Sequence, residues 1–175
     1  MSERVDALLC ERIEAAFNGA FAPGVCLTGG WDEPEYLPGD GDGEVAELRY
    51  VRDYPRSALH ESAHWCIAGA DRRRQTDFGY WYVPTEARSR AQQAAFEQVE
   101  VRPQALEALF CEALSLAFRV SIDNLEAGPV DADAFACRVA EQVACYRRNL
   151  PPRARRRLQA LRDSAAGDGS PATGT

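Results

Sequence analysis

The two histidines of this chain lie four residues apart, in the segment His60-Glu61-Ser62-Ala63-His64. On a helix, side chains four residues apart lie on one face, a single turn from each other. Two imidazoles in that arrangement can bind one metal ion, and a glutamate directly after the first histidine is typical of metal-binding helices. The segment therefore predicts a metal centre.

Two imidazoles leave a divalent metal ion short of protein ligands. Because the chain has no third histidine and no Cys-x-x-Cys pair, a carboxylate must supply the next bond. Glu97 and Glu100, three residues apart on one side of an expected helix, are the leading candidates, and Asp77 is a weaker one. The sequence leaves the choice between the two glutamates open.

Two chemistries fit two histidines and one carboxylate. A zinc ion with Glu61 as general base would make a peptidase. An iron(II) ion with open coordination positions would make an oxygenase, in which Glu61 orients a ligand or serves as a base. The peptidase class with a third zinc histidine six residues after the second is excluded, because Ala70 stands at that position. The non-enzymatic alternative is an interaction module that has no turnover and whose metal only stabilises the fold.

Apolar periodicity and helix-breaking residues predict that most of the chain is helical. The histidine segment lies in a helix that begins near Asp53 and Pro55 and ends before Gly69. Pro103 is expected in the first turn of a separate helix, because proline fits best there. In chain order, helices are expected at residues 5–17, 53–68, 86–100, from 103 onward, 131–148 and 151–162.

Strands are expected in a few short segments. Residues 25–27 and 45–51 are apolar or strand-like, and residues 78–83 are rich in aromatic and β-branched residues and end at Pro84. Residues 36–38 are expected to lie in an extended loop. The predicted fold class is α+β, a mainly helical single domain with a small β-sheet and the metal site on the His-Glu-x-x-His helix. We expect the domain to span residues 1–163 and residues 164–175 to form a flexible C-terminal tail.

Composition excludes several classes of function. The chain has 175 residues and a net charge of −7. Nucleic-acid binding requires a basic face that neutralises phosphates, so this charge argues against a nucleic-acid-binding protein. It contains no apolar run of about 18 residues and no signal-peptide layout, so we expect a cytoplasmic protein that makes no membrane contact. Its six scattered cysteines indicate reduced thiols. No dimer interface can be read, so the oligomeric state stays open.

Five sequence blocks, in this order, resemble the bacterial elongation factor P hydroxylase family. They are residues 32–38 (DEPEYLP), 57–69 (SALHESAHWCIAG), 77–82 (DFGYWY), 96–106 (FEQVEVRPQAL) and 121–126 (SIDNLE). The resemblance covers about residues 5–163. Several long blocks are more specific than the five-residue histidine motif, which alone would favour peptidases.

The resemblance implies a non-haem metal hydroxylase. Its substrate would be elongation factor P, whose modified lysine receives an oxygen atom after another enzyme has attached a β-lysyl group. The family's ligands carry over to His60, His64 and Glu100, and Glu97 then becomes a supporting acid. The implied cofactor is Fe(II), with Zn or Mn as alternatives, and O₂ is the co-substrate. The reductant cannot be assigned to any residue.

A lysine substrate also suggests which residues would contact it. Aromatic rings and acids suit an ammonium group through cation–π contacts and charge. The aromatic candidates are Trp65, Tyr80, Trp81 and Tyr82, and the acidic candidates are Asp77, Asp123 and Glu126.

Overall fold

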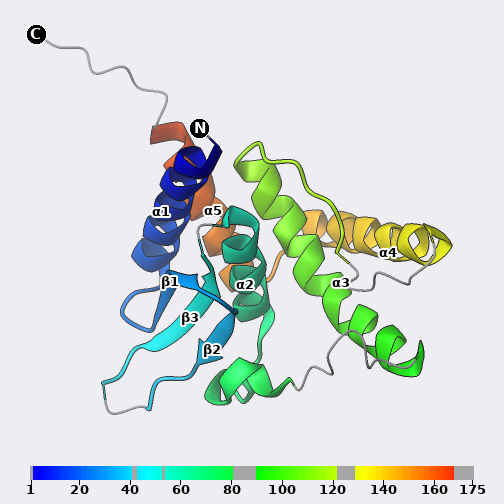
Figure 1. Ribbon diagram of the computed structural model, residues 1–175, viewed down its shortest axis with the longest axis horizontal. Coiled ribbons are helices and arrows are strands. Elements are labelled where there is room, and N and C mark those ends of the chain that lie inside the picture. The colour runs from blue at the N-terminus through cyan, green and yellow to red at the C-terminus, as the bar shows by residue number, and fades with distance from the viewer. Residues whose placement is uncertain (1, 41–42, 53, 81–89, 122–128, 168–175) are drawn as a thin grey trace, which may run out of the picture.

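The computed structural model describes residues 2–40, 43–52, 54–80, 90–121 and 129–167. Within these ranges the chain is mostly helical and has one small sheet (Figure 1). The helices are α1 (Ser2–Phe21), α2 (Pro55–Ile67), α3 (Arg90–Ala113), α4 (Pro129–Arg148) and α5 (Pro152–Gly167), with short 3₁₀ helices η1 (Arg72–Arg74) and η2 (Thr76–Gly79). The strands are β1 (Val25–Trp31), β2 (Glu35–Leu37) and β3 (Ala46–Val51). The predicted class, a mainly helical fold with a small sheet, is confirmed.

The sheet has β3 in its centre. β1 pairs with β3 in parallel, with Leu27 opposite Leu48, and β2 pairs with β3 antiparallel. Burial alternates along β3, where Ala46, Leu48 and Tyr50 are buried and the residues between them are half-buried. This alternation is typical of a sheet that packs one face on a core, and here α1 and α2 pack against that sheet.

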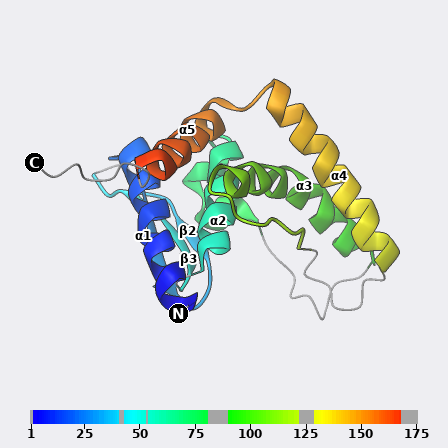
Figure 2. The same ribbon diagram turned by 90° about the horizontal axis from the view of Figure 1, so that it is seen from above.

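Helix α2, which carries both histidines, occupies the middle of the molecule. It packs against α1, α3, α5 and the sheet, and Figure 2 shows it between α1 and α3. Pro55 begins the helix, as expected from its lack of an amide hydrogen. At the other end, Arg73 and Arg153 both donate hydrogen bonds to the Ala68 carbonyl. Two cations at a helix C-terminus complement its dipole and hold the end of α2 in place.

The strand expected at residues 78–83 is wrong where the structure describes it. Phe78 and Gly79 belong to η2, and Asp77 and Phe78 adopt left-handed φ values of 49° and 58°. A strand requires negative φ, so this conformation overrides the strand propensity of the aromatic residues. Tyr80 has an extended backbone but pairs with no strand in the described ranges. Residues 81–83 lie outside the described residues.

Two expected helix boundaries are also wrong. Helix α3 runs through Pro103, so the two helices expected on either side of residues 100–103 are one. The missing amide hydrogen of Pro103 removes one backbone hydrogen bond, but buried Leu106, Leu109 and Phe110 hold the following turns in the core. Helix α5 continues to Gly167, past the expected start of the tail at residue 164, and residues 168–175 lie outside the described residues.

No helix in the described part of the chain is both long and apolar enough to cross a bilayer.

Candidate metal centre

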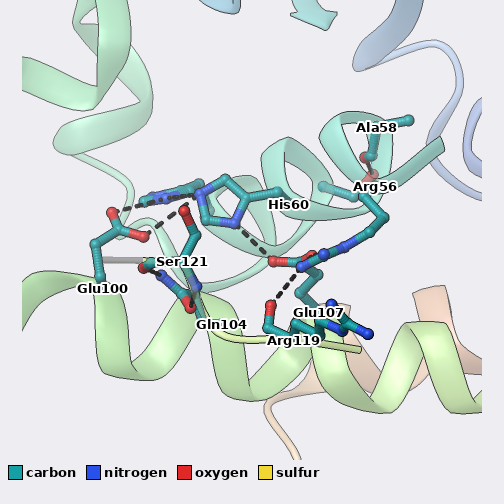
Figure 3. Close-up of polar contacts among 10 residues, drawn as sticks. Arg56, Ala58, His60, Glu100, Gln104, Glu107, Arg119 and Ser121 are labelled. Atoms are coloured by element: carbon teal, nitrogen blue, oxygen red, sulfur yellow. Dashed lines mark hydrogen bonds and ion pairs between the residues drawn. The ribbon is translucent and has the colours of Figure 1, made fainter. Parts of the chain in front are cut away.

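Three potential metal ligands converge between α2 and α3. The Nε2 atoms of His60 and His64 are 3.1 Å apart. Glu100 reaches across from α3, with one carboxylate oxygen 3.4 Å from Nε2 of His60 and the other 3.3 Å from Nε2 of His64. Figure 3 shows Glu100 facing His60 across the gap between the two helices. Ligand atoms from all three residues lie within 4.8 Å of one another.

This donor set fits one divalent ion. Metals bind imidazole nitrogen and carboxylate oxygen at about 2.0–2.2 Å. The two imidazole nitrogens are 3.1 Å apart, and each has its own Glu100 oxygen at 3.3–3.4 Å, so one ion between the three residues, here called the ligand triangle, could reach all of them. All three donors come from two neighbouring helices, α2 and α3. Two imidazoles and one carboxylate on a single face form the arrangement that leaves further positions open for small molecules.

Glu107 orients the first histidine. Its Oε2 atom accepts a hydrogen bond of 2.9 Å from Nδ1 of His60. Arg56 holds the same carboxylate by donating Nε and Nη2 to Oε1, at 3.1 and 3.0 Å, and also donates to the Arg119 carbonyl. Figure 3 shows this chain of contacts. When the ring is neutral, a proton on Nδ1 held by Glu107 leaves the lone pair of Nε2 directed at His64 and Glu100.

Gln104, on the face of α3 that carries Glu100 and Glu107, binds the backbone of Ser121. Its amide donates to the Ser121 carbonyl at 2.6 Å and accepts from the Ser121 amide at 2.9 Å. Sequence reasoning missed both Gln104 and Glu107. Their spacing from Glu100 was an available signal, because positions i, i+4 and i+7 lie on one face of a helix.

The site is electrostatically suited to a cation. Burial would lower the pKa of His60, but the Glu107 hydrogen bond and the charges of Glu100 and Glu61 outweigh burial and raise that pKa to about 9. Burial would raise the pKa of Glu100, but its contacts with His64 and His60 lower it to about 2. Burial raises the pKa of the Glu61 carboxyl, and the two histidines oppose that effect. The ionised Glu100 carboxylate therefore creates a negative field at the imidazoles.

A cavity of about 840 Å³ opens onto this triangle. His60, His64 and Glu100 line it, together with Glu61 and Asp77. The aromatic rings of Tyr36 and Phe78, which also line the cavity, are stacked 4.3 Å apart. The cavity thus combines an acidic lining with an aromatic wall.

The predicted substrate residues lie in different places. Asp77 lines the cavity, and its carboxylate accepts the Tyr36 amide at 2.9 Å, which stabilises its left-handed backbone. Tyr80 meets the His64 ring edge-on, with ring centres 6.4 Å apart, and lies outside that cavity lining. Trp65 is buried in the core, with its ring centre 4.6 Å from that of Phe21, so the structure does not place it on the cavity. Trp81, Tyr82, Asp123 and Glu126 lie outside the described residues.

The two candidate glutamates have different partners in the structure. Glu97 forms an ion pair with Arg138 on α4 and accepts a hydrogen bond from Gln93. Glu100, one turn further along α3, is the carboxylate that faces the histidines. Glu97 therefore joins α3 to α4, and Glu100 has the geometry of a metal ligand.

Comparisons with known proteins agree on one family. The family model described as elongation factor P hydroxylase matches residues 16–169. A curated protein from Haemophilus influenzae, the elongation factor P lysine hydroxylase, is 43% identical to this chain over 154 residues. The alignment covers 86% of this chain and 86% of that relative.

Proposed function

The chain belongs to the elongation factor P hydroxylase family and is a protein-lysine hydroxylase, and we propose that it hydroxylates the β-lysylated lysine of elongation factor P in the cytoplasm. The observation that carries this proposal is the convergence of His60, His64 and Glu100 on an acidic cavity. The domain proposed to do this is residues 1–163, with elongation factor P as its protein partner.

In this proposal His60, His64 and Glu100 would hold the metal. The donor set suits Fe(II), with Zn or Mn as alternatives, and a ferrous ion would supply the activation of O₂. Insertion of one oxygen atom into a C–H bond, with the second oxygen leaving as water, consumes two electrons and two protons from outside. An external reductant must therefore accompany O₂.

The cavity residues would select and orient the substrate. A β-lysylated lysine side chain is long and carries ammonium groups, and the carboxylates of Glu61 and Asp77 attract such a cation. The stacked rings of Tyr36 and Phe78 offer an apolar, electron-rich wall to the same chain. Together these groups would hold the side chain in line with the ligand triangle.

Glu61 has a different role in this reaction from the one it would have in a peptidase. In the zinc peptidase that we considered as the alternative, Glu61 would be the general base and turnover would depend on it. In the hydroxylase Glu61 lines the substrate cavity and orients what binds there. The family match favours the hydroxylase.

The direct test measures the intact mass of elongation factor P. The factor is lysylated beforehand and co-expressed with this chain, with His60→Ala, with Glu100→Ala, or with Glu112→Ala as a matched control. Glu112 is an exposed acid on the same helix, paired with Arg147. We expect a gain of one oxygen, about 16 Da, with the wild type and the control, and none with the two ligand variants. No gain from folded, iron-loaded wild type would contradict the proposal.

A further inference from the structure

A second cavity lies beside the metal centre. It has a volume of about 440 Å³ and, among the described lining residues, shares only His64 with the first cavity. Its lining comes from the end of α2 and the turn that follows, from Tyr80, and from one face of α3. The lining residues that matter below are Ile67, Ala68, Asp71, Arg72, Val99 and Arg102.

The two cavities differ in charge. Among the described residues, the first is lined by the acids Glu35, Glu61, Asp77, Glu100 and Glu107 and by the arginines Arg56 and Arg119. The second is lined by Arg72 and Arg102 and by one acid, Asp71, which is exposed and already paired with Arg74. His64 therefore lies between an acidic cavity and a basic one.

Neutral groups hold both arginines of the second cavity. Arg72 donates Nη1 to the Phe78 carbonyl at 3.1 Å, and its guanidinium lies 4.2 Å from the centre of the Tyr80 ring. Arg102 donates Nε to the Tyr146 hydroxyl at 3.1 Å. In the part of the chain that the structure describes, neither forms an ion pair with a carboxylate.

An arginine of the first cavity behaves differently. Arg56, which lines the first cavity next to the histidines, pairs with the buried carboxylate of Glu107. In a chain with more acids than bases, two positioned but unpaired guanidiniums on one cavity call for an anionic ligand.

We propose that this second cavity binds a small organic carboxylate. A guanidinium carries five N–H donors in a planar fork that matches a carboxylate, and the contacts above occupy one donor on each arginine. Ile67, Ala68 and Val99 add apolar wall for the ligand's carbon chain, which an inorganic anion would not use. This proposal goes beyond the proposed function and does not depend on it.

A carboxylate bound there would also influence the metal centre. His64 is the shared wall, so the ligand would add negative charge next to an imidazole of the ligand triangle. That charge favours a bound cation, and by linkage a bound cation favours the carboxylate. The two ligands should therefore bind with positive coupling.

The test uses calorimetric titration of the full, Mn²⁺-loaded chain with succinate. Succinamide is the neutral control of the same size. Arg72→Gln and Arg102→Gln are the test variants, and Arg74→Gln is the matched control, because Arg74 lies in the same short helix as Arg72 without lining the cavity. All three arginines are exposed, so these variants should keep the fold, which circular dichroism checks.

We expect succinate to bind the wild type and Arg74→Gln equally. Each of the two cavity variants should bind it about tenfold more weakly, because each loses one charged hydrogen-bonding group. Succinamide should not bind measurably. The proposal is overturned if succinate fails to bind the wild type, if it binds both cavity variants as tightly as the wild type, or if succinamide binds as well as succinate.

Discussion

Glu107 anchors the ring of His60, because its carboxylate accepts a hydrogen bond from Nδ1 with a distance of 2.9 Å between Nδ1 and Oε2. The acceptor lies on α3 and the histidine on α2, so this bond joins the two helices that form the site. Only about 4% of the Glu107 side chain is exposed, and Arg56 neutralises it. A buried, paired carboxylate behind a histidine fixes both the tautomer and the angle at which Nε2 approaches a metal.

We predict that Glu107→Gln weakens metal binding by about 10- to 100-fold, the range typical for loss of such an outer carboxylate. The amide keeps the shape of the side chain but removes the charge that makes the imidazole more basic. A competition titration of Mn²⁺ against a chelator measures the change. Glu112→Gln, on the same helix, serves as the control, and equal affinity of the two variants would contradict the role given to Glu107.

Metal binding should strengthen as pH rises. The pKa of His60 lies near 9, above its ordinary value of 6.5, so at pH 7 a metal must displace a proton from this ring. The apparent affinity should increase by about tenfold per pH unit between pH 7 and about 9 and level off above it. Glu100, with a pKa near 2, is ionised throughout and adds nothing to this slope. Mn²⁺ titrations from pH 6.5 to 9.5 measure this pH dependence. An affinity that does not change with pH would contradict the raised pKa of His60 and its role as a ligand.

Glu61→Gln separates the two enzyme classes. In the hydroxylase the variant should bind metal as the wild type does and keep measurable hydroxylation, since Glu61 orients ligands in the cavity. In a peptidase the same change removes the general base and abolishes turnover with the metal still bound. The measurement is intact mass of elongation factor P together with metal content. A variant with full metal and no hydroxylation would argue for an essential proton transfer at Glu61.

Asp77→Asn should weaken binding of a cationic side chain. The amide oxygen can still accept the Tyr36 amide, so the left-handed turn is kept while the charge is lost. We expect KM for lysylated elongation factor P to rise several-fold with kcat little changed. Glu112→Gln is the control, because Glu112 is exposed and lies outside the lining of both cavities. An unchanged KM would remove Asp77 from substrate binding.

Much of the site could be predicted because its signals are local. The pair His60 and His64 lies on one helix, where a spacing of four residues fixes their relative position. From the residues themselves, the candidates for the third ligand were Glu97 and Glu100, one turn of helix apart, and more weakly Asp77. The contact with Arg138, which comes from a helix about 40 residues further on, is what turns Glu97 away from the site. Such long-range pairings are not encoded in local spacing.

The errors in the fold have the same origin. Pro103 predicts a helix start from local rules, but packing of the following apolar residues keeps one continuous helix. The aromatic run after Asp77 predicts a strand, but the hydrogen bond that the Tyr36 amide, 41 residues away, donates to the Asp77 carboxylate favours a left-handed turn. Tertiary contacts therefore outweigh a strand propensity of about 1 kcal/mol in the second case and the cost of an interior proline, about 3 kcal/mol, in the first.

Trp65 is a substrate contact predicted from its residue type, because an aromatic ring suits an ammonium group. The structure places its ring against Phe17 and Phe21, with the Arg153 guanidinium 5.2 Å from the ring centre. Trp65→Phe should therefore lower the free energy of unfolding by about 1–2 kcal/mol, through a partly filled cavity in the core. KM for lysylated elongation factor P should not change. Denaturant unfolding and steady-state kinetics measure the two quantities, and a raised KM with unchanged unfolding would return Trp65 to the substrate channel.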